Sequence, residues 1–125
     1  MVADLVGISL CVTPGEAFYV PMGHKKNDDV LIKKQLKLEN VLKIIKPYLE
    51  DSSIKKVGQN IKYDYRIFLQ HGIQMNSIED TMLMSYALDA GKNRHGMDLL
   101  SEIHLDHKPI TFKDVAGTGK SQVTF

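Results

Sequence analysis

Hydrophobic residues at the start of the chain follow a pattern that predicts two β-strands. Residues 5–12 and 17–21 are rich in β-branched, aromatic and other apolar side chains, and a Thr-Pro-Gly-Glu segment at residues 13–16 separates them. Proline fits the second position of a type II turn, and glycine fits the third, where φ is positive. We therefore expect a β-hairpin, and Pro21 indicates either an edge strand or the end of the second strand, because proline cannot donate to a strand ladder.

Further along the chain, the apolar positions recur with the spacing of a helix. The residues of this stripe are Leu38, Val41, Leu42, Ile45 and Leu49. They predict an amphipathic helix whose apolar side faces a core. The polar, lysine-rich residues 24–34 before it are expected to form a loop, and Pro47 is expected to kink the helix or to end its regular part.

The rest of the sequence predicts alternating strands and helices. The expected elements are a strand over 54–59, a helix over 62–70, a strand over 73–78, and helices over 81–88 and 97–105. Asn60 is the expected N-cap of the helix over 62–70, which Gly72 is expected to end, and Asp80 is the expected N-cap of the helix over 81–88. Residues 110–125 are expected to form a tail with a glycine-containing loop. Together with the hairpin, this order predicts an α/β sandwich with a mixed sheet.

Composition and charge place the chain among ordinary globular domains. Its 125 residues are 43% hydrophobic and 25% charged, which fits one domain and excludes a disordered tail, a collagen-like fibre and a disulfide scaffold. Cys11 is the single cysteine, which fits a reducing compartment. No apolar run approaches the roughly 20 residues that span a bilayer, and the start lacks a secretory signal pattern. We therefore expect a cytoplasmic protein with no membrane contact.

Neither the charge distribution nor the glycine-containing loop near the end of the chain predicts a phosphate-binding site. Residues 25–62 carry ten lysines against five acidic residues, a local charge of +5 within a net charge of +1. Such a stretch permits contact with phosphates, but it is more typical of a solvated helix face. The sequence Gly-Lys-Ser at 119–121 would end a nucleotide-binding loop only if a glycine stood at position 114, where the chain has Asp114.

The most informative segment is Val-Gly-Gln-Asn-Ile-Lys-Tyr-Asp at residues 57–64. It predicts a strand end, an amide-rich turn and a carboxylate, Asp64, in the first turn of a helix. Strand ends of α/β sheets are common places for sites, and the helix dipole keeps such a carboxylate ionised. An ionised, fixed carboxylate is a suitable ligand for a hard divalent cation. The alternative is that Asp64 only solvates the start of the helix.

This segment resembles the second exonuclease motif in the 3′–5′ proofreading domain of bacterial family A DNA polymerases, the DNA polymerase I type. Other segments match that domain in the same order, so the resemblance extends over the whole chain. They are residues 5–9, 19–21, 42–51, 80–83, 94–100 (Arg-His-x-Met-Asp-x-Leu), 110–112 (Ile-Thr-Phe) and 117–120. The resemblance implies an RNase H-like fold, a mixed five-stranded sheet flanked by helices, for a partial exonuclease domain over residues 1–125.

The implied chemistry is hydrolysis of phosphodiesters at DNA 3′ ends by two metal ions, Mg²⁺ or Mn²⁺. Asp64 corresponds to one of four metal-binding acids of the family. The family's Asp-x-Glu motif on the first strand and its Tyr-x-x-x-Asp motif on a later helix do not occur in this sequence. We therefore expect a domain without its first strand and last helices, and no useful hydrolysis by the chain alone.

The resemblance also implies the residues that contact a single-stranded DNA 3′ end, with a polymerase domain as the neighbour in the parent protein. These residues are Gln59, Asn60, Tyr63, Arg94 and Phe112. Local alternatives exist: Tyr63 and Phe112 as half-buried aromatics, and Arg94 as a partner of Asp98 one helical turn away. At the level of the whole chain, the alternative is a non-catalytic remnant that binds nucleic acid or serves as a scaffold.

Overall fold

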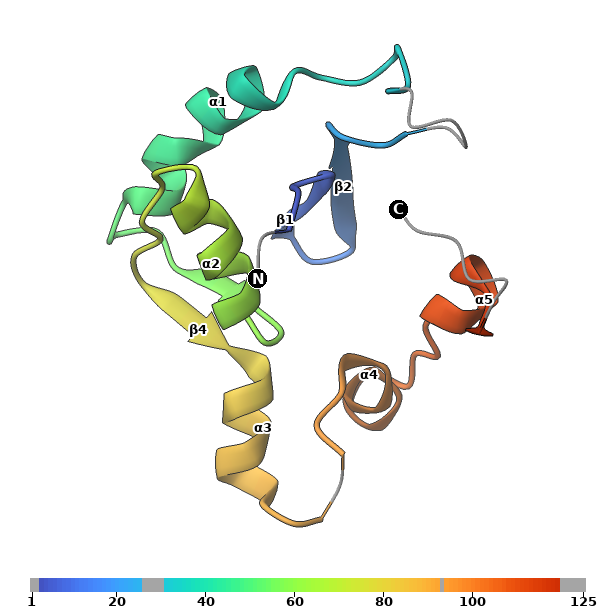
Figure 1. Cartoon of the computed structure of the whole chain (residues 1–125). Coiled ribbons are helices and arrows are strands. Elements are labelled where there is room, and N and C mark those ends of the chain that lie inside the picture. The colour runs from blue at the N-terminus through green and yellow to red at the C-terminus, as the bar shows by residue number, and fades with distance from the viewer. Residues whose placement is uncertain (1–2, 26–30, 93, 120–125) are drawn as a thin grey trace.

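The computed structural model describes residues 3–25, 31–92 and 94–119, which form a mixed α/β arrangement of small sheets and helices (Figure 1). The elements are β1 (Gly7–Thr13), β2 (Glu16–Pro21), α1 (Leu38–Glu50), β3 (Lys56–Gly58), α2 (Lys62–Gln70), β4 (Ile78–Asp80), α3 (Thr81–Asp89), α4 (Met97–Leu105) and α5 (Phe112–Ala116). Part of the expected loop at 24–34 and the end of the expected tail lie outside the described residues. No helix in the described part is long and apolar enough to span a membrane.

The predicted hairpin is confirmed. β1 and β2 pair antiparallel in a register that places Gly7 opposite Pro21 and Ile8 opposite Val20. Gly15 has φ of +88°, the left-handed backbone that the turn between the strands requires. β2 ends at Pro21, as expected for a residue without a backbone donor.

The second sheet is small and parallel. β3 pairs with β4 so that Val57 lies opposite Glu79 and Gly58 opposite Asp80. Within the described residues, this pair and the hairpin form two separate sheets, so the single mixed sheet expected from the sequence is not formed there. The strand expected over 73–78 is also wrong: pairing begins only at Ile78. The backbone N–H groups of Gln74 and Asn76 donate instead to the end of α1, to the Glu50 carboxylate over 3.2 Å and the Leu49 carbonyl over 3.0 Å.

The core lies where the hairpin, α1 and α2 meet the segment between α2 and β4. Its buried residues are Ile8, Met22, Val41, Leu49, Ile61, Phe68, Ile73 and Met75. The apolar stripe of α1 therefore faces this core, as its spacing predicts. Pro47 does not end the helix, which continues to Glu50, and the N–H of Asp51 donates to the Pro47 carbonyl over 3.1 Å. The Pro47 ring is exposed, so the helix accommodates it without disturbing the buried side.

The C-terminal helices are much less buried. Figure 1 shows α3, α4 and α5 extending away from α1 and α2, and neither α3 nor α4 contains a buried residue. α5 lies within residues 110–125, for which the sequence predicts only a tail. Its start is a reciprocal cap, in which the Thr111 hydroxyl accepts from the Asp114 N–H over 3.3 Å and the Asp114 carboxylate accepts from the Thr111 N–H over 3.3 Å.

Candidate functional site

The turn between β3 and α2 is the structural centre of the candidate site. Gly58 ends β3 in close contact with Ile61, where an added Cβ would lie 3.1 Å from that side chain. Asn60 has φ of +56°, a left-handed conformation that asparagine tolerates better than most residues. Asn60 is therefore not the N-cap expected from the sequence: the capping position belongs to Ile61, which makes no side-chain cap bond.

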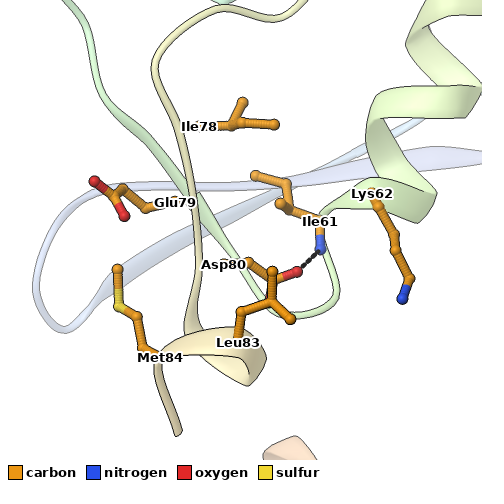
Figure 2. A pocket seen from close by; sticks show the side chains of 7 residues that line it. All are labelled: Ile61, Lys62, Ile78, Glu79, Asp80, Leu83 and Met84. Carbon is orange, nitrogen blue, oxygen red and sulfur yellow. Dashed lines mark hydrogen bonds between the residues drawn. The ribbon is translucent and has the colours of Figure 1, made fainter. Parts of the chain in front are cut away.

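The carboxylate of Asp80, at the end of β4, stabilises this turn. It accepts the backbone N–H groups of Asn60 and Ile61 over 3.0 and 3.1 Å, and that of Met82 over 2.9 Å. Figure 2 shows the bond from Ile61. Partial desolvation raises the pKa of Asp80, but the N–H groups of Asn60, Met82, Leu83 and Ile61 outweigh it and hold the pKa below its usual value. One carboxylate thus caps α3, as predicted, and also fixes the start of α2.

Asp64 lies in the first turn of α2, one helical turn beyond Asn60, and its side chain is exposed. Partial desolvation raises its pKa, its own N–H acts in the opposite direction, and the negative charge of Asp80 raises it further. Asp80 is engaged by three backbone donors, whereas Asp64 is exposed. The described residues contain no group of three or more His, Cys, Asp or Glu that could hold a metal ion.

Gln59 connects the turn to two distant segments. Its amide Nε2 donates to the His95 carbonyl over 2.7 Å, and its Oε1 accepts from the Thr81 hydroxyl over 2.5 Å. The Thr81 hydroxyl also lies 3.2 Å from the Gly58 carbonyl. The half-buried Gln59 side chain is therefore held in place by residues from α3 and from the segment that precedes α4.

The other predicted contact residues are distributed over two regions. Tyr63 lies next to Asp64 on α2 with 49% of its surface exposed, and Arg94 is exposed beside the buried His95. Phe112, also 49% exposed, begins α5, which lies apart from α2 in Figure 1. The structure thus brings together Gln59, Asn60, Tyr63, Asp64 and, through His95, the segment of Arg94, but it does not bring Phe112 to them.

Three residues of this region were missed by the sequence analysis as parts of a site: Asp80, Thr81 and His95. Asp80 was expected to cap only α3, and its bonds to the start of α2 span about 20 positions of sequence. The available signal was that Asp80 and His95 both fall within the segments that carry the family resemblance. Beside Asp80 lies a hollow of about 300 Å³ with a mainly apolar lining, which Figure 2 shows.

Comparison with known proteins gives a consistent result over the whole chain. A family model described as 3′–5′ exonuclease matches residues 1–125. The DNA polymerase I of Rhizobium leguminosarum is 46% identical over 139 residues, covering 100% of this chain and 14% of the relative. The DNA polymerase I of Pseudomonas aeruginosa is 42% identical over 126 residues, covering 98% of this chain and 14% of the relative. The chain therefore spans about a seventh of the length of these curated relatives.

Proposed function

The chain belongs to the 3′–5′ exonuclease family found in A-type DNA polymerases, and we propose that it contributes part of a site that removes nucleotides from DNA 3′ ends. The observation that carries the proposal is the exposed Asp64 carboxylate, which lies in the first turn of α2, just after the turn that follows β3. Such a carboxylate suits a divalent cation at a phosphodiester. The relatives that support the assignment are DNA polymerases I, so a polymerase domain is the proposed neighbour.

The described residues fit one ligand of a metal site and not a complete site. Asp64 offers a single carboxylate, and Asp80 is already bonded to three backbone N–H groups. Mg²⁺ gives up its water reluctantly, so one carboxylate would hold it weakly. We propose that further ligands for Mg²⁺ or Mn²⁺ come from residues other than the described ones, and that the chain alone hydrolyses DNA poorly.

The same proposal gives a role to the two separate sheets. In the RNase H-like fold that the family resemblance implies, a central strand lies between the hairpin and β3. Adding such a strand would join the antiparallel and parallel pairs into one mixed sheet, and it would cover edges that are otherwise prone to aggregation. The RNase H-like arrangement is part of the proposal.

We propose that the DNA strand passes the turn between β3 and α2. Asn60 and Tyr63 would line the pocket for the 3′-terminal nucleotides, and Gln59 would support that pocket through its bonds to Thr81 and His95. Arg94, which is exposed, would meet the backbone phosphates. Phe112 would stack on a base only if α5 approaches α2 more closely than it does in this structure.

A chimera tests the proposal. Residues 1–125 would replace the matching segment of the R. leguminosarum DNA polymerase I, and shortening of 5′-labelled single-stranded DNA would be followed on a denaturing gel with Mg²⁺. If that parent polymerase trims 3′ ends, we expect the chimera to trim them too, and Asp64→Asn to reduce the rate at least about 100-fold, because a metal ligand is lost. Asp106→Asn makes the same chemical change at an exposed position in α4's C-cap and should leave the rate unchanged.

Polymerase activity of the chimera serves as the folding control. Trimming that persists in Asp64→Asn would contradict the role of Asp64. Clear 3′ trimming by the 125-residue chain alone would contradict the expected inactivity. A chimera that binds single strands in a salt-dependent way, without metal-dependent cleavage, would favour the alternative of a non-catalytic nucleic-acid-binding module.

A further inference from the structure

A chain of side-chain contacts links the predicted site to the segment before α4. Gln59 reaches 36 positions along the sequence to donate to the backbone carbonyl of His95 over 2.7 Å. Its other amide atom accepts from Thr81, the first residue of α3. The backbone at His95 is therefore tied directly to the turn that carries Asn60.

The His95 ring holds this backbone in place from the other side. His95 is the buried polar residue of the described chain, with 6% of its surface exposed. Its Nδ1 lies 2.8 Å from the Ser85 hydroxyl, and its ring centroid lies 3.7 Å from that of Tyr86. Both partners belong to α3, so His95 anchors its segment on α3 while its carbonyl faces Gln59. The neighbouring Arg94 is exposed.

We propose that His95 is a positioning residue, which holds Arg94 beside the turn between β3 and α2 so that its guanidinium meets a phosphate of the DNA strand. This inference rests on the proposed function. Burial of the His95 ring fixes the backbone next to Arg94. With that backbone already ordered, only the Arg94 side chain has to lose conformational freedom when it binds a phosphate. The contacts of Ser85, Tyr86 and Gln59 with His95 are the parts that maintain this arrangement.

The first test measures DNA binding by the 125-residue chain in metal-free buffer, using fluorescence anisotropy of a 5′-labelled oligothymidylate at several salt concentrations. The slope of log K against log [salt] is negative, and losing one phosphate contact on a single strand reduces its magnitude by about 0.7. We expect Arg94→Gln and His95→Gln each to produce that change, and the double variant to produce no more than either one. Their effects are then non-additive, as for two residues acting as a unit.

His107→Gln makes the same change at an exposed histidine and should leave affinity and slope unchanged. Ser85→Ala removes the hydrogen-bond partner of the His95 ring while keeping His95 itself. It should also reduce the magnitude of the slope. If His95 is only structural, His95→Gln would lower the melting temperature, but at temperatures below it the slope would stay at the wild-type value. That result, together with a reduced slope magnitude in Arg94→Gln, would overturn the positioning role of His95.

A second measurement does not depend on DNA. Hydrogen exchange of the Gln59 side-chain amide, followed by NMR, reports its bond to the His95 carbonyl. We expect exchange to accelerate in His95→Gln and in Ser85→Ala, but not in His107→Gln. If the wild-type chain fails to bind DNA, or if Arg94→Gln has no effect, the DNA contact of the proposed function fails. Unchanged Gln59 exchange in both His95→Gln and Ser85→Ala overturns the anchoring by His95.

Discussion

Two aspartates of the same region show opposite electrostatic behaviour. Asp80 is surrounded by backbone N–H groups that stabilise its charge, and its pKa is lowered although desolvation acts in the other direction. Asp64 is partly desolvated and lies near the negative charge of Asp80, and its pKa is raised. The first carboxylate therefore stabilises the fold when ionised, whereas the second destabilises it when ionised. A group that costs stability is typical of a functional position.

Removing the Asp80 carboxylate should destabilise the fold in a pH-dependent way. A folded pKa below the usual 3.8 gives stability that is fully present above that value and is lost as pH falls through the folded pKa. Asp80→Ala should therefore lower the thermal midpoint at pH 7, and its difference from wild type should shrink toward pH 3. Circular dichroism melts at both values measure this, with Asp4→Ala as an exposed control. A difference that does not depend on pH would show that the charge of Asp80 is not the cause.

Asp64→Asn should have the opposite sign. A folded pKa above 3.8 means that ionisation disfavours the folded state at neutral pH, and that this penalty disappears as pH falls below 3.8. The substitution should raise the thermal midpoint at pH 7 and have no effect near pH 3, while Asp106→Asn changes neither. A lower midpoint at pH 7 would instead favour the simpler interpretation, in which Asp64 serves only to stabilise the start of α2.

At the scale of elements, local rules predicted the hairpin and the helices α1 to α4. The 3.6-residue spacing identified α1, and the Pro-Gly turn identified the hairpin, because both signals come from neighbouring residues. The start of α2 was assigned to the wrong cap, since its N–H groups are satisfied by Asp80 from another strand. The strand before α3 was predicted to begin at residue 73 instead of 78. Apolar and polar residues alternate from Ile73 to Asn76 as in a strand, but Ile73 and Met75 are apolar because they lie in the core.

α5 was missed although its signal is local. Thr111 and Asp114 have the spacing of a capping box, and the structure contains both reciprocal bonds. The helix itself is five residues long and buries only Ala116, so no apolar stripe accompanied the cap. A cap without a stripe gives little indication of a helix, which is why the segment was expected to be a tail.

Pro47 makes α1 less stable than its length allows. Proline lacks the N–H that would bond to the carbonyl four residues earlier, and this costs up to about 3 kcal/mol in a helix interior. Because Pro47 is exposed and lies in the last part of α1, Pro47→Ala should raise the free energy of unfolding by about 1 to 3 kcal/mol. Urea denaturation followed by circular dichroism measures the change, and Lys43→Ala on the same helix is the control. No gain would mean that proline contributes equally by restricting the unfolded chain.

At the scale of the whole molecule, the sequence motif located the segment of the candidate site but not its supports. Gln59, Asn60, Tyr63 and Asp64 are consecutive or nearly so, and a motif can identify them together. The bond from Gln59 to His95 joins residues 36 positions apart, and no local pattern encodes such a distance. The catalytic and DNA-contacting roles stay predictions, while the geometry of the turn is a property of the fold.

The chain exposes far more surface than a compact folded monomer of the same mass. Its accessible surface is 10043 Å², whereas a folded monomer of 14.1 kDa exposes about 6,700 Å². Part of the difference is apolar, as in α3, where Leu83 is 60% and Leu88 81% exposed. The excess exceeds what a standard protein–protein interface of about 1,600 Å² buries. The chain by itself therefore presents apolar surface that favours association.

We expect the isolated 125-residue chain to bind the dye ANS strongly and to associate as its concentration rises. Both effects follow from the exposed apolar side chains of α3 and α4, which would be covered when neighbouring segments pack on them. Dye fluorescence and sedimentation velocity between micromolar and hundred-micromolar protein measure them. The chimera with the R. leguminosarum polymerase provides the comparison, because its additional segments should reduce dye binding per molecule and suppress association. A chain that stays monomeric at high concentration and binds little dye would contradict the role of the exposed apolar side chains of α3 and α4 in association.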